Sequence, residues 1–164
     1  GKNTNVIVRN NTIIDVPVWG IKVGQGSRRV LVEKNYLEEC GLAALTAYAN
    51  MYQNGSQEQA YFRQNVCVNT AKDEHWAGSG KGRGIIHFEG NDQTAPGSDI
   101  PLAICRRNYA EYNVLLELDA DPKIGYAIME HELARENVFR YNYYEGNISP
   151  PQLSASAIYI PYEG

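Results

Sequence analysis

The sequence predicts an all-β fold in which short parallel strands stack into a solenoid, that is, a parallel β-helix. Three observations lead to this prediction: a six-residue pattern recurs along the chain, short apolar runs alternate in the manner of strands, and long helical patterns are missing. The composition agrees, because 15 Gly and 12 Tyr among 164 residues favour strands and turns. We expect residues 1–164 to form one domain.

The recurring segments each begin apolar, become charged, and end in Asn four times and in Glu once. They are residues 6–11, 30–35, 60–65, 103–108 and 127–132. Their last residues lie 24, 30, 43 and 24 positions apart. A base period near 24, lengthened twice by insertions, predicts about five coils with one coil per repeat.

A second short apolar run follows each segment. The runs cover residues 19–23, 42–45, 84–88, 114–118 and 138–141. Apolar residues within them often alternate, as a strand with one buried face requires. The helical halves of leucine-rich or ankyrin repeats are missing, so we interpret the repeats as ladders of strands.

Stacked coils lie about 4.8 Å apart, so equivalent residues form columns along the stack. Two columns of the first segment are expected to face inward. They are Val6, Val30, Ala60, Ala103 and Ala127, and Val8, Val32, Phe62, Cys105 and Met129. The last column, Asn11, Asn35, Asn65 and Asn108, predicts a ladder of side-chain amides, with Glu132 at its end.

The overall composition excludes several classes of protein. The net charge of −4 gives no support to nucleic-acid binding. No apolar run approaches the roughly 18 residues of a membrane-spanning helix. Cys40, Cys67 and Cys105 contain no CxxC pair, and we expect small buried hydrophobic side chains rather than a zinc site or a disulfide framework.

The V-x-V-x-x-N pattern of residues 6–11 and 30–35, with G-I-x-V at 20–23, resembles the right-handed parallel β-helix superfamily. That superfamily includes pectate-lyase-like polysaccharide lyases, C5-epimerases, polygalacturonase-type hydrolases and phage tailspikes. Residues 20–37 are especially similar to coils of alginate- and chondroitin-type lyases. The resemblance implies a right-handed solenoid, an extracellular or virion-surface location and an acidic polysaccharide as partner. No catalytic motif of the superfamily matches, so the resemblance assigns no catalytic residue.

Two columns that face outward form a charged ribbon on the first strands. They are Arg9, Glu33, Arg63, Arg106 and Glu130, and Asn10, Lys34, Gln64, Arg107 and His131. One interpretation is a solvated face with ion pairs between coils, such as Glu33 with Arg9 or Arg63, and Glu130 with Arg106. The other is a track for a chain of acidic sugars, whose carboxylates or sulfates the arginines would pair.

Two insertions, at residues 69–83 and 90–99, are expected as long loops on the third coil. The first loop gathers acidic, basic and aromatic groups, and its Trp76 could stack on a sugar ring. His87, in the strand between the loops, is expected at the surface, facing away from the core. The segment that starts at His131 lacks the second histidine of a zinc protease helix, so that motif is rejected.

The leading functional prediction is binding of an acidic polysaccharide, with β-elimination as the cleavage chemistry to test first. The residues assigned to it are catalytic candidates Lys72, His75, Arg63 and Arg106, substrate-binding candidates Arg107, Trp76, His131, Lys34 and Arg83, and cation-ligand candidates Asp73 and Glu33, with Ca²⁺ as the ion. No other cofactor is expected. Two alternatives stay open: hydrolysis by carboxylates such as Asp73, Glu74 and Asp99, and a non-catalytic tailspike or adhesin segment.

One outward column is apolar at every position: Ile7, Leu31, Tyr61, Ile104 and Ile128. Such a stripe should be covered, and the candidates are residues 157–162, a loop, or neighbouring subunits of a homotrimer. The first repeat begins within six residues of Gly1 without a cap. We therefore expect a fragment, or a domain that docks on an upstream domain.

Overall fold

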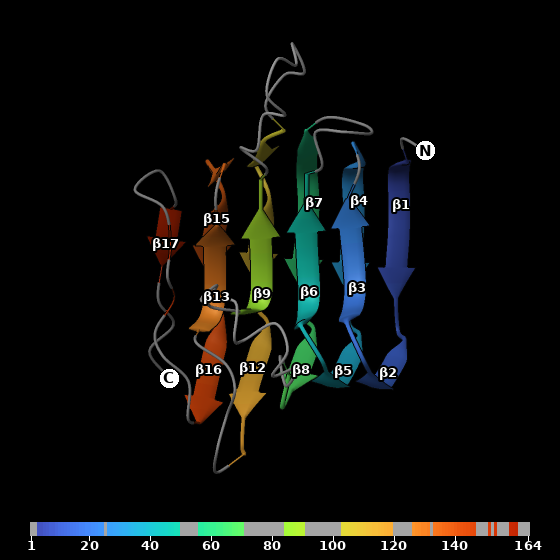
Figure 1. Cartoon of the computed structure of the whole chain (residues 1–164), viewed down its shortest axis with the longest axis vertical. Helices are drawn as coiled ribbons and strands as arrows, with labels where there is room; N and C mark the ends of the chain where they lie inside the picture. The colour runs from blue at the N-terminus through green and yellow to red at the C-terminus, as the bar shows by residue number, and fades with distance from the viewer. Residues whose placement is uncertain are drawn as a thin grey trace, which may run out of the picture.

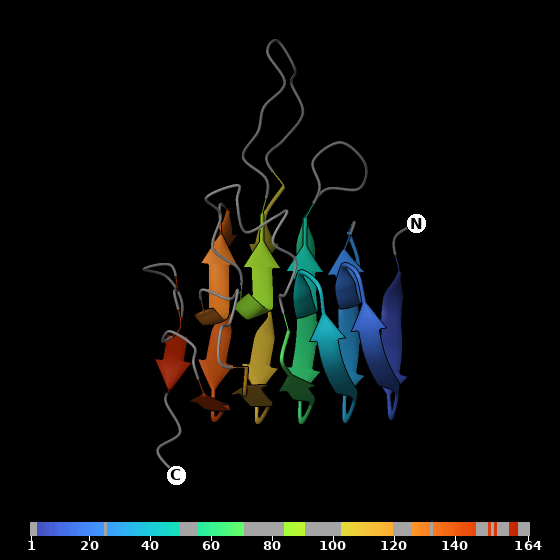
Figure 2. The same ribbon diagram turned by 60° about the horizontal axis from the view of Figure 1, so that its bottom comes forward.

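The computed structural model describes residues 3–24, 26–49, 56–70, 84–90, 103–119, 126–131, 133–146, 151, 153 and 158–160. These residues form strands, turns and bends, and every strand pairing among them is parallel. The strands belong to three sheets, and each sheet adds one strand as the chain passes along the stack. Figures 1 and 2 show the strands of each sheet side by side along the stack, with β1 at one end and β17 at the other. This arrangement confirms the all-β prediction and is consistent with a β-solenoid.

Sheet A contains the first strand of each pass. Its members are β1 (Thr4–Arg9), β4 (Arg28–Glu33), β7 (Gln57–Arg63), β10 (Cys105–Arg106) with β11 (Tyr109–Glu111), β14 (Ala134–Arg135) with β15 (Val138–Arg140), and β17 (Ile158–Ile160).

Sheets B and C contain the strands that follow. Sheet B is formed by β2 (Thr12–Val16), β5 (Tyr36–Cys40), β8 (Val66–Val68), β12 (Val114–Glu117) and β16 (Tyr143–Gly146). Sheet C is formed by β3 (Trp19–Gly24), β6 (Ala43–Tyr48), β9 (Gly84–Glu89) and β13 (Tyr126–His131). A pass therefore has three strands, whereas the sequence pattern suggested two. We call the strands of one pass a level of the stack. Levels are counted from the N-terminal end, so that β1, β2 and β3 form the first level and β4, β5 and β6 the second.

Inward-facing side chains of the three sheets form one continuous core. Phe62, Phe88 and Phe139 are fully buried in it, and the Phe88 ring lies 5.6 Å from that of Phe62 and 5.1 Å from that of Phe139. All three cysteines are buried free thiols, as expected. Burial raises the pKa of Cys40 to about 11 and raises those of Cys67 and Cys105 further.

An amide ladder runs through the stack, but one predicted member was wrong. The ladder is Asn11, Asn35, Asn65, Asn113 and Asn142, and each Asn donates its backbone N–H and Nδ2 to the Oδ1 of the next at 2.8–3.0 Å. Its steps are 24, 30, 48 and 29 residues. Asn108 instead begins a second, shorter ladder, with its Nδ2 2.9 Å from Oδ1 of Asn137.

Left-handed backbone residues recur every five positions in a pass, with Asp15, Glu39 and Asn69 as a third series, and this recurrence explains the error. The residue just before each Asn of the main ladder has a left-handed backbone conformation: Asn10, Lys34, Gln64, Tyr112 and Tyr141. The residue five positions earlier has the same conformation: Asn5, Arg29, Gln59, Arg107 and Glu136. Arg107-Asn108 and Tyr112-Asn113 therefore have the same local geometry, and only strand pairing distinguishes them. Tyr61 pairs with Tyr109, which places residues 103–108 at the earlier corner.

The predicted inward columns need the same correction. Val6, Val30 and Ala60 are in register, and so are Val8, Val32 and Phe62. The second column then continues through Ala110 and Phe139 rather than Cys105 and Met129. Residues 127–131 lie in β13 of sheet C, so this segment is not a sheet A strand, and Glu132 lies outside the described residues.

Candidate functional site

The outer face of sheet A carries most of the positive charge of the described chain. We call this surface, with the two corners beside it, the arginine face. Of the ten basic residues that the structure describes, only Lys22 lies elsewhere, and the nine on this face are Arg9, Arg28, Arg29, Lys34, Arg63, Arg106, Arg107, Arg135 and Arg140. Four acidic residues share the face: Glu33, Glu58, Glu111 and Glu136. The face thus carries an excess of five positive charges on a chain of net charge −4.

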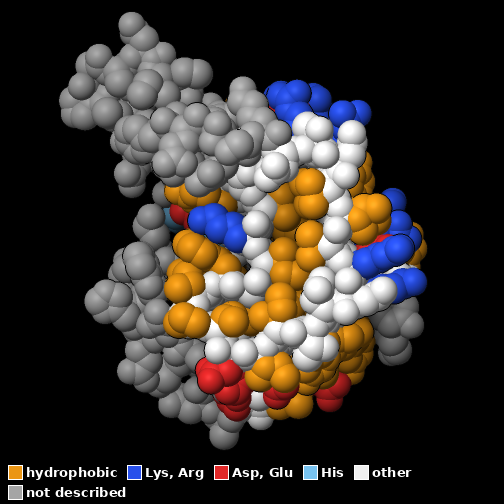
Figure 3. Space-filling model, turned by 90° about the vertical axis from the view of Figure 1, so that its right-hand side faces the viewer, with side chains coloured by type: hydrophobic (Ala, Val, Ile, Leu, Met, Phe, Trp, Pro, Cys, Tyr) orange, Lys and Arg blue, Asp and Glu red, His pale blue; other side chains and the backbone are white. Residues whose placement is uncertain are grey.

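Sheet B has the opposite character. On its described strands and the residues that directly follow them there are six acidic residues and no Lys or Arg: Asp15, Glu38, Glu39, Glu117, Asp119 and Glu145. Figure 3 looks onto the N-terminal end of the stack, with most of the red side chains along the lower margin and the blue ones at the top, on the right and on the left. The fold therefore separates charges that are mixed along the sequence.

Charges on the arginine face form two rows along the stack. The row nearest the main ladder is Arg9, Glu33, Arg63, Glu111 and Arg140, strictly alternating in sign from level to level. Within it, Arg63 lies 4.0 Å from Glu33, and Arg140 Nη2 lies 2.7 Å from Glu111. The predicted pairing of Glu33 with Arg63 is therefore confirmed.

The second row is Arg28, Glu58, Arg106 and Arg135. Arg106 Nη2 lies 2.7 Å from Glu58 and Arg28 Nε lies 3.9 Å from it, so one carboxylate lies between two guanidinium groups. The predicted pairing of Arg106 with Glu130 was wrong, because Glu130 lies on β13 and accepts a hydrogen bond from Asn137.

Arginines on this face extend further into solvent than the glutamates between them. The side chains of Arg28, Arg63, Arg106 and Arg140 are 30–57% exposed, whereas those of Glu33, Glu58 and Glu111 are 11–15% exposed. A ligand that approaches would therefore meet guanidinium groups first. Exposed ion pairs stabilise a fold by only about 0.2–1 kcal/mol each, so the more exposed and longer-paired Arg28 and Arg63 can exchange partners at small cost.

An apolar column runs between the two rows, and its first three members are those that the sequence predicted. Its members are Ile7, Leu31, Tyr61, Tyr109 and Val138, with the last two in the places predicted for Ile104 and Ile128. The rings of Tyr61 and Tyr109 are 4.9 Å apart and nearly parallel. Their faces are therefore turned to each other along the stack. The C-terminal strand β17 pairs with β15 and extends sheet A, rather than covering this column.

Sheet C carries a second group of ionisable side chains. His87 Nε2 lies 3.9 Å from Glu89, and His131 is in register with Glu89 on the next strand. Tyr48 is in register with Glu89 on the other side, and Lys22 Nζ lies 4.3 Å from the centre of the Tyr48 ring. Burial lowers the pKa of Lys22, with Glu89 opposing that shift.

His87 and His131 are therefore placed differently from the prediction. His87 is 2% exposed, so it is buried and not a surface residue. His131 belongs to sheet C and not to the charged face of sheet A where it was expected. Sequence reasoning missed Lys22 and Tyr48 because only the strand register of sheet C brings them to Glu89.

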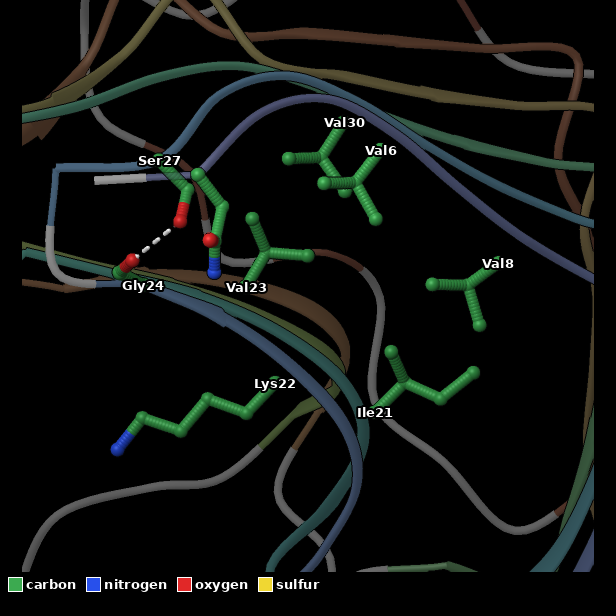
Figure 4. Close-up of a pocket in the computed structure, with 9 residues that line it drawn as sticks. Val6, Val8, Ile21, Lys22, Val23, Gly24, Ser27 and Val30 are labelled. Carbon is green, nitrogen blue, oxygen red and sulfur yellow. Dashed lines mark hydrogen bonds between the residues drawn. The ribbon is translucent and has the colours of Figure 1, made fainter. Parts of the chain in front are cut away.

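The N-terminal end of the stack is hollow. A hollow of about 400 Å³ is lined by Val6, Val8, Ile21, Val23 and Val30, among others. Figure 4 shows these valines pointing into it and the Lys22 chain leading away. Nearby, the Ser27 hydroxyl donates a 2.7 Å hydrogen bond to the Gly24 carbonyl, which fixes the bend before β4. The hollow is the open end of the core at the first level.

The remaining predicted site residues lie either outside the described part of the chain or on the arginine face. Lys72, Asp73, Glu74, His75, Trp76, Arg83 and Asp99 lie outside the described part of the chain. Lys34 is exposed at the corner after β4, and Arg107 pairs with Glu136 at 3.2 Å. Arg63 and Arg106 were expected in one column, but Arg63 belongs to the row of Glu33 and Arg106 to the row of Glu58.

Neither a metal site nor a membrane helix is found in the described residues. No group of three or more His, Cys, Asp or Glu among them is arranged to hold a metal ion. Nor does that part of the chain contain a helix long and apolar enough to cross a bilayer.

No protein-family model, no curated protein and no solved structure matches this chain.

Proposed function

We propose that this chain binds an acidic polysaccharide along the arginine face, as a right-handed parallel β-helix of about five coils related to the pectate-lyase-like superfamily. The observation that carries the proposal is the difference in exposure on sheet A, where protruding arginines overlie glutamates that are 11–15% exposed. Guanidinium groups bind carboxylates and sulfates through two parallel hydrogen bonds. Rows on a rigid sheet suit an extended anionic chain.

Cleavage is a separable part of the proposal. In β-elimination a base removes the proton on the carbon next to a uronate carboxylate, a C=C bond forms, and the glycosidic oxygen leaves with a proton from an acid. Lys72 and His75 are the proposed bases, and Arg63 and Arg106 would neutralise the uronate carboxylate. Asp73 and Glu33 are the proposed Ca²⁺ ligands, and Glu33 would have to leave Arg63 to act so.

A specific observation favours a second candidate, a non-catalytic segment such as those in tailspikes or adhesins. Arg106 lies 2.7 Å from Glu58, and Arg63, in the other row, lies 4.0 Å from Glu33. These two catalytic candidates thus have partners within the fold and stand in different rows. In this second proposed function the arginine face binds a glycan without cleaving it.

One panel of measurements tests the proposal. Purified chain is titrated with alginate, polygalacturonate, chondroitin and a neutral glucan, while ultraviolet absorbance of unsaturated uronates is followed. Binding to at least one acidic glycan and none to the glucan is expected, with about two- to fivefold weaker binding for Arg106→Ala. A rise in absorbance would support cleavage, and binding without it would support the non-catalytic candidate. Failure to bind any acidic glycan contradicts the proposal.

The matched control is Glu38→Gln on sheet B. Glu38 accepts a 3.0 Å hydrogen bond from the Tyr36 hydroxyl, which Gln can also accept. This control should bind like the parent chain.

A further inference from the structure

The sign of the charge in the Arg9 row changes at every level of the stack. Arginines occupy the first, third and fifth levels (Arg9, Arg63 and Arg140), and glutamates occupy the second and fourth (Glu33 and Glu111). Neighbouring strands lie about 4.8 Å apart, so arginines recur every ~9.6 Å. The row therefore has a charge period of two levels.

The second row has a similar spacing, shifted by one level. Arg28 and Arg106 stand at the second and fourth levels, and Glu58 lies between them at the third. Arg135 at the fifth level breaks the alternation. Alternation at neighbouring levels keeps like charges from facing each other directly, which would destabilise the sheet.

This period limits which anionic chain fits the row. A sugar residue in an extended chain advances by about the spacing of one level, so anions on alternate sugars stand about two levels apart. A chain aligned with the stack could place each of those anions on an arginine. A chain charged at every sugar would also place anions above Glu33 and Glu111, and like charges in close contact repel.

We propose that the Arg9 row of the arginine face selects an acidic polysaccharide with one anionic group on every second sugar over one charged at every sugar. This inference rests on the proposed function and specifies its ligand. The selectivity comes from the glutamates as much as from the arginines, because the glutamates penalise the wrong charge spacing.

The test compares two ligands of matched length, unsulfated chondroitin, with a carboxylate on alternate sugars, and polygalacturonate, with one on every sugar. The parent chain is expected to bind chondroitin more tightly. In Glu33→Gln/Glu111→Gln the affinity for polygalacturonate should rise by about two- to fivefold for each glutamate removed, and that for chondroitin by less than twofold. Circular dichroism and thermal unfolding verify that the variants fold. If the double variant is destabilised, the single variant Glu111→Gln replaces it in the comparison of the two ligands.

The control Glu38→Gln/Glu145→Gln removes two carboxylates from sheet B, where both accept tyrosine hydrogen bonds. It should leave the preference unchanged. Equal or tighter binding of polygalacturonate by the parent chain overturns this inference while leaving the proposed function standing. An equal gain for both ligands in the sheet A variant also overturns it. Binding of neither ligand, nor of any other acidic glycan, overturns both.

Discussion

Asn65 connects three levels of the stack through its side chain. Its Nδ2 donates to the Val32 carbonyl and to Oδ1 of Asn113, and its own Oδ1 accepts from the backbone and side chain of Asn35, all at 3.0 Å. The residue is fully buried, so no solvent can replace these bonds. Every polar atom of this buried side chain is hydrogen-bonded. Its loss would leave its buried partners, such as the Val32 carbonyl, without that bond, so the side chain stabilises the corner.

Replacement of Asn65 with Ala should therefore lower the free energy of unfolding by about 2–4 kcal/mol. The control is Asn11→Ala at the exposed end of the same ladder, where solvent reaches the groups left behind, and less than about 1 kcal/mol should be lost. Urea unfolding of both variants measures the difference. Equal losses would show that the ladder does not stabilise the interior.

Because the cysteine thiols are buried, the free energy of unfolding should depend on pH in the alkaline range. Unfolded cysteines ionise near pH 9, whereas folded Cys40 ionises near 11 and the pKa values of Cys67 and Cys105 are raised further. The unfolded state thus loses protons first, so the free energy of unfolding should fall as pH rises from 9 to 11. Urea unfolding at several pH values measures the slope. Cys67→Ala should make it shallower, and an unchanged slope would contradict the assignment.

At the scale of the element, tight corners set how closely the strands stack. Gly41 lies between β5 and β6 beneath the preceding level, where its N–H donates to the Val16 carbonyl at 2.8 Å. A Cβ at this position would lie 2.1 Å from the Pro17 carbonyl oxygen, far inside contact distance. The neighbouring corner backbone, rather than a side chain, excludes any larger residue.

Gly41→Ala should consequently destabilise the protein by at least about 2 kcal/mol, since backbone must move apart. Gly24→Ala is the comparison, because a Cβ there would meet the Tyr48 carbonyl at a less severe 3.0 Å. Differential scanning calorimetry of the two variants should rank Gly41→Ala as the less stable. The reverse order would argue against close stacking at this corner.

At the scale of the whole molecule, the fold creates a charge asymmetry. Among the described residues, Lys and Arg concentrate on sheet A, and the charged residues of sheet B are all acidic, although the two kinds are mixed along the chain. A charged surface attracts counter-ions and polyelectrolytes according to its local field rather than the net charge of the protein. The protein therefore has a basic face although the net charge of the whole chain is −4.

Because of this asymmetry, the chain should bind both a sulfonate cation exchanger and a quaternary-amine anion exchanger at pH 7 and low salt. Arg28→Ala/Arg106→Ala should elute from the cation exchanger at lower salt, because it removes exposed guanidinium groups. On the anion exchanger the same variant should bind no more weakly than the parent. Passage of the parent chain through the cation exchanger without retention would contradict the asymmetry.

The sequence by itself determined the all-β class, the parallel stacking, the first three ladder asparagines and the first three members of the outward apolar column. These features depend on local alternation and on repeat periods of 24 and 30 residues, which a single chain displays directly. Only the tertiary structure decided the fourth and fifth levels. Two Asn corners five residues apart satisfy the same local pattern, and the pairing of Tyr109 with Tyr61 selects between them. The alternating row of Arg63, Glu111 and Arg140 followed from that register. The pairing of β9 with β13 in sheet C brought the rings of His87 and His131 to 6.2 Å, because contacts between levels join residues that no local pattern relates.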